Sequence, residues 1–192
     1  MLKIISENLT QNNIPFALIG AMSLILYGLS RYTSGIDLLT EGHYRPQLIQ
    51  SMEKLGYTCY QKSDSFAQFE SETETFGYID FMFVNTEDGK NILRRCIVAG
   101  NDLFGDSPVI QPTDHIILKL MAIANNPKRS PRHEADISAI LRLYKKGLIP
   151  ACFETLDTDR IYQFADKFGQ RQRFKKHLNT VFEKSGKSGF IL

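Results

Sequence analysis

Residues Phe16–Glu41, FALIGAMSLILYGLSRYTSGIDLLTE, form the stretch of sequence that decides the fold. A short apolar strand, Phe16–Ile19, stops at Gly20, and a short buried helix follows at once. The N-terminus of a helix offers free backbone N–H groups and the positive end of a dipole, which together can bind a phosphate. A second strand, Ile36–Leu39, then carries one acid, Asp37. Because burying an acid is costly unless it binds a cation or hydrogen-bond donors, this pattern predicts a phosphate or cation site.

A second lone acid, Asp80, stands in the middle of Tyr78–Val84, the most hydrophobic strand that the sequence predicts. Two acids, each alone in a core strand, indicate a shared cation if the two strands are neighbours. Magnesium prefers carboxylate and phosphate oxygens together, so such a site could align the phosphates of a nucleotide for in-line attack. The structural alternative is that each acid caps a turn or pairs with an arginine.

The remaining pattern predicts an α+β protein, with a small mixed sheet flanked by helices and a helical region after it. Further strands are predicted over 57–61, 66–70 and within 98–110, and further helices over 1–13, 46–55 and 86–97. After Pro112 the pattern is helical only, with helices over 113–124, 132–144, 159–168 and 170–184 and a loose tail over 185–192. We therefore expect an α/β domain over 1–110 and a helical region over 111–192.

Composition excludes several classes of protein. The 192 residues are 43% hydrophobic and 23% charged, which is typical of a globular protein and excludes a disordered chain, a collagen or a coiled-coil rod. No run of about 18 apolar residues occurs, so no multi-span membrane protein is expected. The N-terminus has no signal-peptide pattern, and the three cysteines form no Cys-x-x-Cys pair. A cytoplasmic protein with free thiols and no membrane partner is expected.

Charge is divided unevenly between the two predicted regions. Residues 1–110 carry 8 Lys and Arg against 13 Asp and Glu, while residues 111–192 carry 15 against 8. The net charge of +2 therefore combines an acidic first region of −5 with a basic second region of +7. Either the two regions are merely solvated differently, or the basic region contacts phosphates and forms a cleft with the acidic one.

These motifs resemble the nucleotidyltransferase superfamily, which shares the fold of DNA polymerase β. The similarity is greatest to the small bacterial branch of minimal nucleotidyltransferases and AbiEii-type toxins. Gly20-Ala21 matches the family's strand-ending turn, and the segment from Arg31 to Leu39 matches its Arg-x-Thr-x-Asp-x-Asp signature. Asp80 matches the third acid on a later strand. The resemblance covers about residues 16–142.

The resemblance implies a role for each matching residue. Asp37 and Asp80 would hold Mg²⁺ or Mn²⁺, and Asp80 would help to deprotonate an acceptor hydroxyl. The nucleotide would be bound by residues of the turn, the signature and a helix of the second region, namely Gly20, Ala21, Ser23, Arg31 and Lys119. Glu134-Ala-Asp136-Ile137 matches a helix that supports the site.

Several of these residues have structural alternatives. Arg31 could pair with a nearby acid, Lys119 could be an ordinary solvated lysine, and Asp136 could pair with Lys119 or Arg132. A basic cluster near the C-terminus is either a solvated helix face or a contact for phosphate or RNA. It consists of Arg171, Arg173, Lys175 and Lys176, with Phe174 among them.

One position departs from the family pattern. The first Asp of the Asp-x-Asp pair is Gly35 here, so the chain keeps only Asp37 of two carboxylates that would share one face of the strand. Losing a metal ligand should weaken metal binding, because two-metal phosphoryl transfer depends on several carboxylates.

Three hypotheses follow. The protein transfers a nucleoside monophosphate from a nucleoside triphosphate to a hydroxyl of RNA, protein or a small molecule. Alternatively, it is a catalytically silent module that binds nucleotide or RNA. The third, by analogy with the family alone, is a toxin-like factor controlled by an antitoxin-like protein.

Overall fold

The computed structural model describes residues 1–33, 35–71, 77–101 and 105–183 and divides the chain into two compact units, Met1–Gln111 and Pro112–Leu192. The tail 185–192, which the sequence predicts to be loose, lies outside the described residues. No described helix is both long and apolar enough to cross a membrane.

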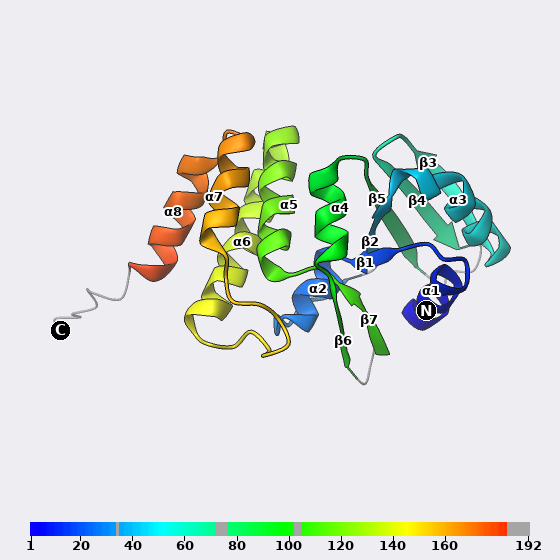
Figure 1. Cartoon of the computed structure of the whole chain (residues 1–192), viewed down its shortest axis with the longest axis horizontal. Coiled ribbons are helices and arrows are strands. Elements are labelled where there is room, and N and C mark those ends of the chain that lie inside the picture. Colours follow the sequence, from blue (N-terminus) through cyan, green and yellow to red (C-terminus); the bar gives the residue numbers. More distant parts are fainter. Residues whose placement is uncertain (34, 72–76, 102–104, 184–192) are drawn as a thin grey trace. The chain divides into compact units, whose positions relative to one another are not determined.

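The first unit is a seven-stranded mixed sheet with the strand order β3-β4-β5-β2-β1-β7-β6 (Figure 1). Its strands are β1 (Phe16–Leu18), β2 (Gly35–Glu41), β3 (Tyr57–Lys62), β4 (Phe66–Ser71), β5 (Tyr78–Val84), β6 (Ile97–Asn101) and β7 (Gly105–Val109). Its helices are α1 (Leu2–Gln11), α2 (Gly20–Leu26), α3 (Arg45–Lys54) and α4 (Glu87–Arg94). The pairs β2–β5 and β1–β7 are parallel, whereas the other neighbouring pairs are antiparallel.

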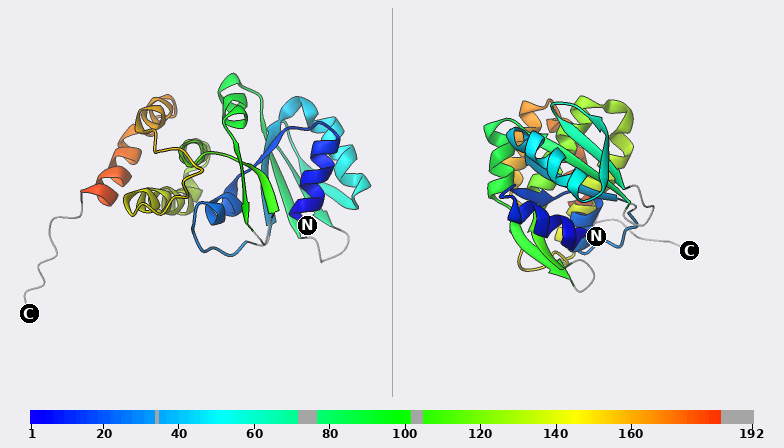
Figure 2. Two further views of the ribbon diagram at one scale, coloured as in Figure 1. Left: turned by 60° about the horizontal axis from the view of Figure 1, so that its bottom comes forward. Right: turned by 90° about the vertical axis from the view of Figure 1, so that its right-hand side faces the viewer.

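One face of this sheet is packed and the other is more open. Helices α1 and α3 contact each other and cover the same face (Figure 2). Alternate residues of β5, such as Ile79 and Phe81, are buried, and the Phe81 ring meets the Phe69 ring edge-on at 5.7 Å. Asp80 and Met82, which alternate with them along β5, are only half-buried. The period-2 pattern thus separates a core face from a face on which β5 is less buried.

The strands and helices agree closely with the sequence pattern, with two local differences. A 3₁₀ turn, Gly42–Tyr44, precedes α3, which begins at Arg45 with Pro46 in its first turn. Helix α4 ends at Arg94 rather than continuing to residue 97, because Ile97 already belongs to β6. An α+β fold with a mixed sheet and C-terminal helices is therefore confirmed.

The second unit is made of helices. They are α5 (Pro112–Asn125), α6 (Ser130–Lys145), α7 (Thr158–Lys167) and α8 (Arg171–Phe182), with a 3₁₀ turn at Pro127–Arg129. Apolar side chains from all four helices are buried, and Phe174 of α8 is fully buried. A charged pair lies in this core: the Arg160 guanidinium donates to the fully buried Asp114 carboxylate at 2.9 and 3.1 Å.

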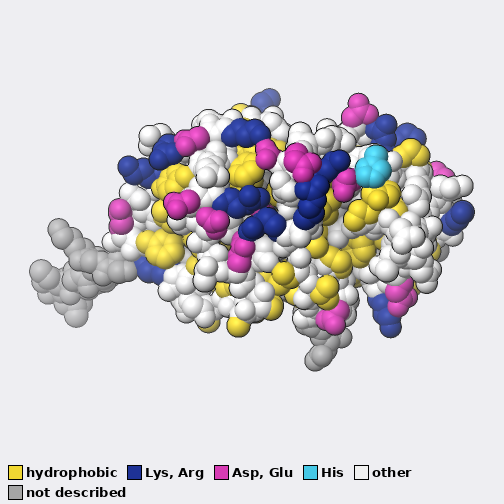
Figure 3. Space-filling view, in the orientation of Figure 1, with side chains coloured by type: hydrophobic (Ala, Val, Ile, Leu, Met, Phe, Trp, Pro, Cys, Tyr) yellow, Lys and Arg dark blue, Asp and Glu magenta, His cyan; other side chains and the backbone are white. Residues whose placement is uncertain are grey.

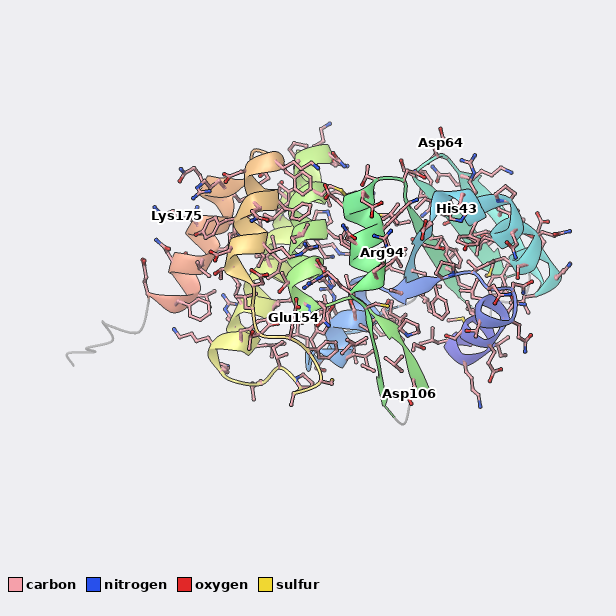
Figure 4. All side chains as sticks on the ribbon, in the orientation of Figure 1. His43, Asp64, Arg94, Asp106, Glu154 and Lys175 are labelled. Atoms are coloured by element: carbon pink, nitrogen blue, oxygen red, sulfur yellow. The ribbon has the colours of Figure 1, made fainter. Side chains whose placement is uncertain are left out.

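The basic cluster on α8 is partly neutralised within its own unit. Arg171 pairs with Asp166 at 2.5 Å, and Arg173 pairs with Glu134 of α6. Lys175 and Lys176 are exposed, and Lys175 projects away from the helices (Figure 4). On the face shown in Figure 3, acidic and basic side chains alternate over these helices. This arrangement favours the solvated helix face over a continuous phosphate-binding surface.

We expect His177 to make the stability of the second unit depend on pH. Its Nδ1 lies 2.9 Å from the Ser138 hydroxyl, and burial lowers the pKa of the imidazole, helped by Lys176 and Arg173 and opposed by Glu134. The folded protein therefore binds the proton less readily than the unfolded chain, so stability falls as the pH drops below the ordinary histidine value of about 6.5.

We expect the melting temperature to fall between about pH 7 and about pH 5, and His177→Gln to reduce that fall. Thermal unfolding followed by circular dichroism measures both. The control is His43→Gln, an exposed histidine of the first unit. An identical pH dependence in wild type and His177→Gln would contradict the assignment.

Candidate active site

Asp37 and Asp80 lie directly opposite each other on neighbouring parallel strands. The register of β2 and β5 pairs Asp37 with Asp80, so both side chains leave the same face of the sheet about 4.8 Å apart along the hydrogen-bonding direction. Both residues are half-buried. Like charges directly opposite in a sheet repel each other, and a bound cation would remove that repulsion. The sequence predicted the two acids, and the structure brings them together.

Gly20 has no side chain and so leaves space for the Asp37 carboxylate. It adopts the left-handed conformation at φ +63°, and a Cβ at this position would lie 1.9 Å from Asp37 Oδ2. The adjacent Ile19 N–H donates to the Asp37 carbonyl at 3.0 Å. Glycine is required here both for the backbone conformation and for the close approach of the carboxylate. The Asp37 carboxylate therefore lies against the turn that begins α2.

We predict that Gly20→Ala will destabilise the protein by about 1–3 kcal/mol and will displace the Asp37 carboxylate. The cost has two sources, the positive φ and the overlap of the new methyl group with Asp37. Urea unfolding measures the first effect, and Mg²⁺ titration followed by NMR of the Asp37 amide measures the second. Gly147→Ala is the control, because Gly147 also has a positive φ (+64°) but a Cβ there would meet nothing within 4 Å. Equal effects of the two substitutions would contradict the contact with Asp37.

Asp80 is held by a residue that sequence reasoning did not single out. Gln68 lies opposite Asp80 in β4, and its Nε2 donates to Asp80 Oδ1 at 3.0 Å. Only the strand pairing identifies Gln68 as the neighbour of Asp80. This hydrogen bond fixes the orientation of the Asp80 carboxylate.

The other predicted nucleotide ligands of the first unit lie at the start of α2 and before β2. Ala21 is buried, and Ser23 is fully buried with its hydroxyl donating to the Gly20 carbonyl at 2.9 Å. That bond closes the first turn of α2 and leaves the hydroxyl without exposed surface. Arg31 is half-buried in the segment that leads into β2. Their roles in binding nucleotide stay predictions.

Gly35 lies where the family signature has its first acid, and the structure gives a reason for glycine there. A Cβ at Gly35 would lie 2.9 Å from the main-chain oxygen of Tyr78, its partner in β5. Because a backbone atom cannot move aside cheaply, β2 and β5 are packed too closely at this point for a side chain. Within the described ranges, no group of three or more His, Cys, Asp or Glu side chains is placed to hold a metal. The register places two carboxylates, Asp37 and Asp80, opposite each other.

Gly35→Asp is therefore expected to lower the melting temperature rather than to restore a metal site. The new side chain must push β2 away from β5, which would also disturb the pairing of Asp37 with Asp80. Thermal unfolding and Mg²⁺ titration test this expectation together. A variant that keeps its stability and binds Mg²⁺ more tightly would show that the strands separate easily.

Lys119 and Asp136 form an ion pair in the second unit. Lys119 Nζ of α5 lies 2.7 Å from Asp136 Oδ2 of α6, and the two side chains are 16% and 3% exposed. This is one of the pairings that the sequence left open for Asp136. Burial lowers the pKa of nearby His133, and the charge of Lys119 lowers it further. The structure thus shows the Lys119 amine neutralised by a buried carboxylate.

Comparison with solved structures identifies the fold. The antibiotic-resistance factor ANT(2'')-Ia, in complex with adenylyl-2''-tobramycin, superposes with a TM-score of 0.61 at 13% identity, over 89% of this chain and 98% of that one. The solution structure of ANT(2'')-Ia superposes with a TM-score of 0.61 at 13% identity, over 93% of this chain and 95% of that one. An antigenic nucleotidyltransferase-like protein from Paracoccidioides brasiliensis superposes with a TM-score of 0.55 at 13% identity, over 95% of each chain.

The chain has the nucleotidyltransferase fold. No protein-family model and no curated protein matches its sequence. At 13% identity the likeness concerns the fold alone. Membership of the minimal nucleotidyltransferase and AbiEii-type branch stays a prediction.

Proposed function

We propose that the protein is a metal-dependent nucleotidyltransferase whose active centre is the pair Asp37 and Asp80. The observation that carries this proposal is their register, which sets two carboxylates side by side on the open face of the sheet. The donor set fits magnesium or manganese, because these cations take one or two carboxylates and complete their coordination with phosphate oxygens and water. A bound cation would neutralise the developing charge of the transferred phosphate.

The reaction would replace a phosphoanhydride bond of the nucleotide by a phosphate ester bond to the acceptor. The acceptor hydroxyl oxygen forms a bond to the α-phosphorus of a nucleoside triphosphate, the bond from that phosphorus to the bridging oxygen breaks, and pyrophosphate leaves. The hydroxyl proton passes to the carboxylate of Asp80, which Gln68 holds in place. Backbone N–H groups of Gly20 and Ala21 would donate to phosphate oxygens.

As the resemblance implies, Lys119 would offset the charge of a bound phosphate. The Lys119 amine is paired with Asp136. A bound phosphate would therefore share the amine with Asp136 or compete with Asp136 for it. Arg31 would be a further phosphate contact, as the resemblance implies.

A catalytically silent nucleotide-binding or RNA-binding module is the second candidate. The specific observation that favours it is the close approach of Gly35 to the Tyr78 main chain, which leaves two carboxylates for catalysis. This module would bind nucleotide with Mg²⁺ in calorimetry and would show no turnover. Control by an antitoxin-like protein rests on family resemblance alone.

The acceptor can be RNA, a protein side chain or a small molecule. The solved structure of ANT(2'')-Ia, which has this fold, is in complex with adenylyl-2''-tobramycin, which supports a small-molecule acceptor. The test incubates the full chain with each α-labelled nucleoside triphosphate, Mg²⁺ or Mn²⁺, and the RNA, protein and small-molecule fractions of a cell extract. Metal-dependent label transfer supports the proposal. Nucleotide binding without transfer to any fraction would favour the silent module.

A further inference from the structure

Two tyrosine rings stand exposed on the open face of the sheet beside the proposed centre. Tyr60 of β3 is 47% exposed and Tyr78 of β5 is 52% exposed. The two rings meet edge-on with their centroids 6.4 Å apart. Tyr78 precedes Asp80 by two residues, so both side chains leave the same face of β5. Large aromatic side chains are costly to leave in water, and a pair of them beside a candidate active centre suggests a ligand surface.

A β-bulge in β3 lies at Tyr60. The pairing of β3 with β4 shifts between Cys59 and Gln61, so two residues of β3 lie opposite Gln68 alone. A bulge re-aims a side chain, and bulges are common next to active sites. Without it, strict alternation from Thr58 would still place Tyr60 on this face but Gln61 on the other. The bulge brings Tyr60 and Gln61 together next to Gln68, the residue that holds Asp80.

The charged side chains on this face are acids. Glu70 is exposed and lies opposite Tyr78 in β5, while Asp80 and Asp37 occupy the next row of the sheet. Among the described residues of β2–β5 that the register places on this face, none is a lysine or arginine. Partial burial raises the pKa of the Tyr60 hydroxyl, and so does the negative charge of Asp80 and Glu70. The aromatic pair is therefore set in a negative field.

We propose that Tyr60, Tyr78 and Glu70 bind the acceptor, and that the acceptor is an amine-bearing sugar or similar ring compound. A ring packs against the exposed tyrosine faces, and its ammonium group is attracted by Glu70 and by the tyrosine rings. The acceptor hydroxyl then lies beside Asp80. This inference rests on the proposed function, because it names the substrate class of the same site.

The same charges disfavour RNA as the acceptor. Nucleic-acid surfaces combine aromatic stacking with lysine and arginine contacts to phosphates. Here the aromatic pair is flanked by carboxylates, so phosphates on a bound RNA would be repelled. An aromatic surface alone could bind either RNA or an amine-bearing ring compound. The negative charge beside it favours the amine-bearing compound.

Saturation-transfer NMR with the full chain tests the proposal, without nucleotide or metal. The probes are glucosamine below neutral pH, its uncharged counterpart N-acetylglucosamine, spermidine as a cation without a ring, and a six-nucleotide single-stranded RNA. We expect glucosamine to bind at least about fivefold more tightly than the other three. Because no catalysis is needed, a protein that binds glucosamine but transfers no nucleotide would disprove the proposed function and leave this surface standing.

Variants locate the surface. Tyr60→Ala and Tyr78→Ala should each weaken glucosamine binding at least about fivefold, while Tyr78→Phe should retain it. Glu70→Gln should weaken it, and the control Glu53→Gln, an exposed acid on α3, should not. Circular dichroism verifies that each variant folds. Tighter binding of RNA than of glucosamine, equal binding of N-acetylglucosamine, or unchanged binding in the Tyr→Ala variants would each overturn the proposal.

Discussion

Asp80→Asn is expected to reduce nucleotidyl transfer by about 10³-fold while leaving the fold intact. Asparagine has nearly the same size, and its side-chain oxygen can still accept the hydrogen bond from Gln68 Nε2. The substitution removes one negative charge from the cation site and the base that accepts the hydroxyl proton. Several kcal/mol of transition-state stabilisation depend on these two contributions, and each 1.36 kcal/mol corresponds to a factor of ten in rate.

Initial rates of label transfer, measured across Mg²⁺ concentrations, provide the test. Asp37→Asn should show a similar loss, and the double variant should be scarcely worse than either single variant, because two ligands of one cation act as a unit. Asp106→Asn is the control: this exposed acid lies on the β6–β7 hairpin (Figure 4). If Asp80→Asn keeps its rate, or if the losses of the two single variants multiply, the shared-cation site is wrong.

The local part of this site could be predicted from sequence. Asp37 and Asp80 stand out because each is a single acid in an apolar strand, and Gly20 stands out because it ends a strand. Helices and strands follow local periodicity in the same way, which is why most of their bounds agree with the pattern. The family resemblance added the expected fold.

The pairings could not be predicted, because they are non-local. The parallel register that joins Asp37 to Asp80 depends on a strand order in which β5 lies beside β2. Gln68 reaches Asp80 through the next strand along, and the bulge beside Tyr60 is a property of the β3–β4 pair. The spacing of residues along a strand indicates which face of the sheet each one occupies. It does not indicate which residue of the next strand lies beside it.

Some roles also change once side-chain partners are known. Ser23 satisfies the predicted pattern of a phosphate-binding turn, yet its hydroxyl is buried against the Gly20 carbonyl. Gly35 resembles a lost metal ligand, and the close Tyr78 main chain gives the glycine a packing role. Both cases show that a motif match identifies a position, while the contacts decide what its residue can do.

Arg160→Ala should destabilise the second unit by about 3–5 kcal/mol, the largest effect on stability that we expect. The guanidinium of Arg160 makes two bonds to the Asp114 carboxylate, which has no exposed surface. Removing it would leave a buried charge without its cation. The same guanidinium lies 5.1 Å from the centre of the Phe164 ring, so packing would be lost as well.

Arg171→Ala is the matched control, because Arg171 pairs with Asp166 at 2.5 Å where both side chains are about half exposed (53% and 50%). Its loss should cost less than about 1 kcal/mol, since water solvates both partners of an exposed pair. Urea unfolding of the full chain measures both variants. The cost of Arg160→Ala should come from the unpaired buried charge. Combining Asp114→Asn with Arg160→Met removes that charge and fills the space of the arginine, so this double variant should regain most of the stability that Arg160→Ala loses. Equal costs for Arg160→Ala and Arg171→Ala would show that the Asp114 carboxylate is satisfied without its arginine.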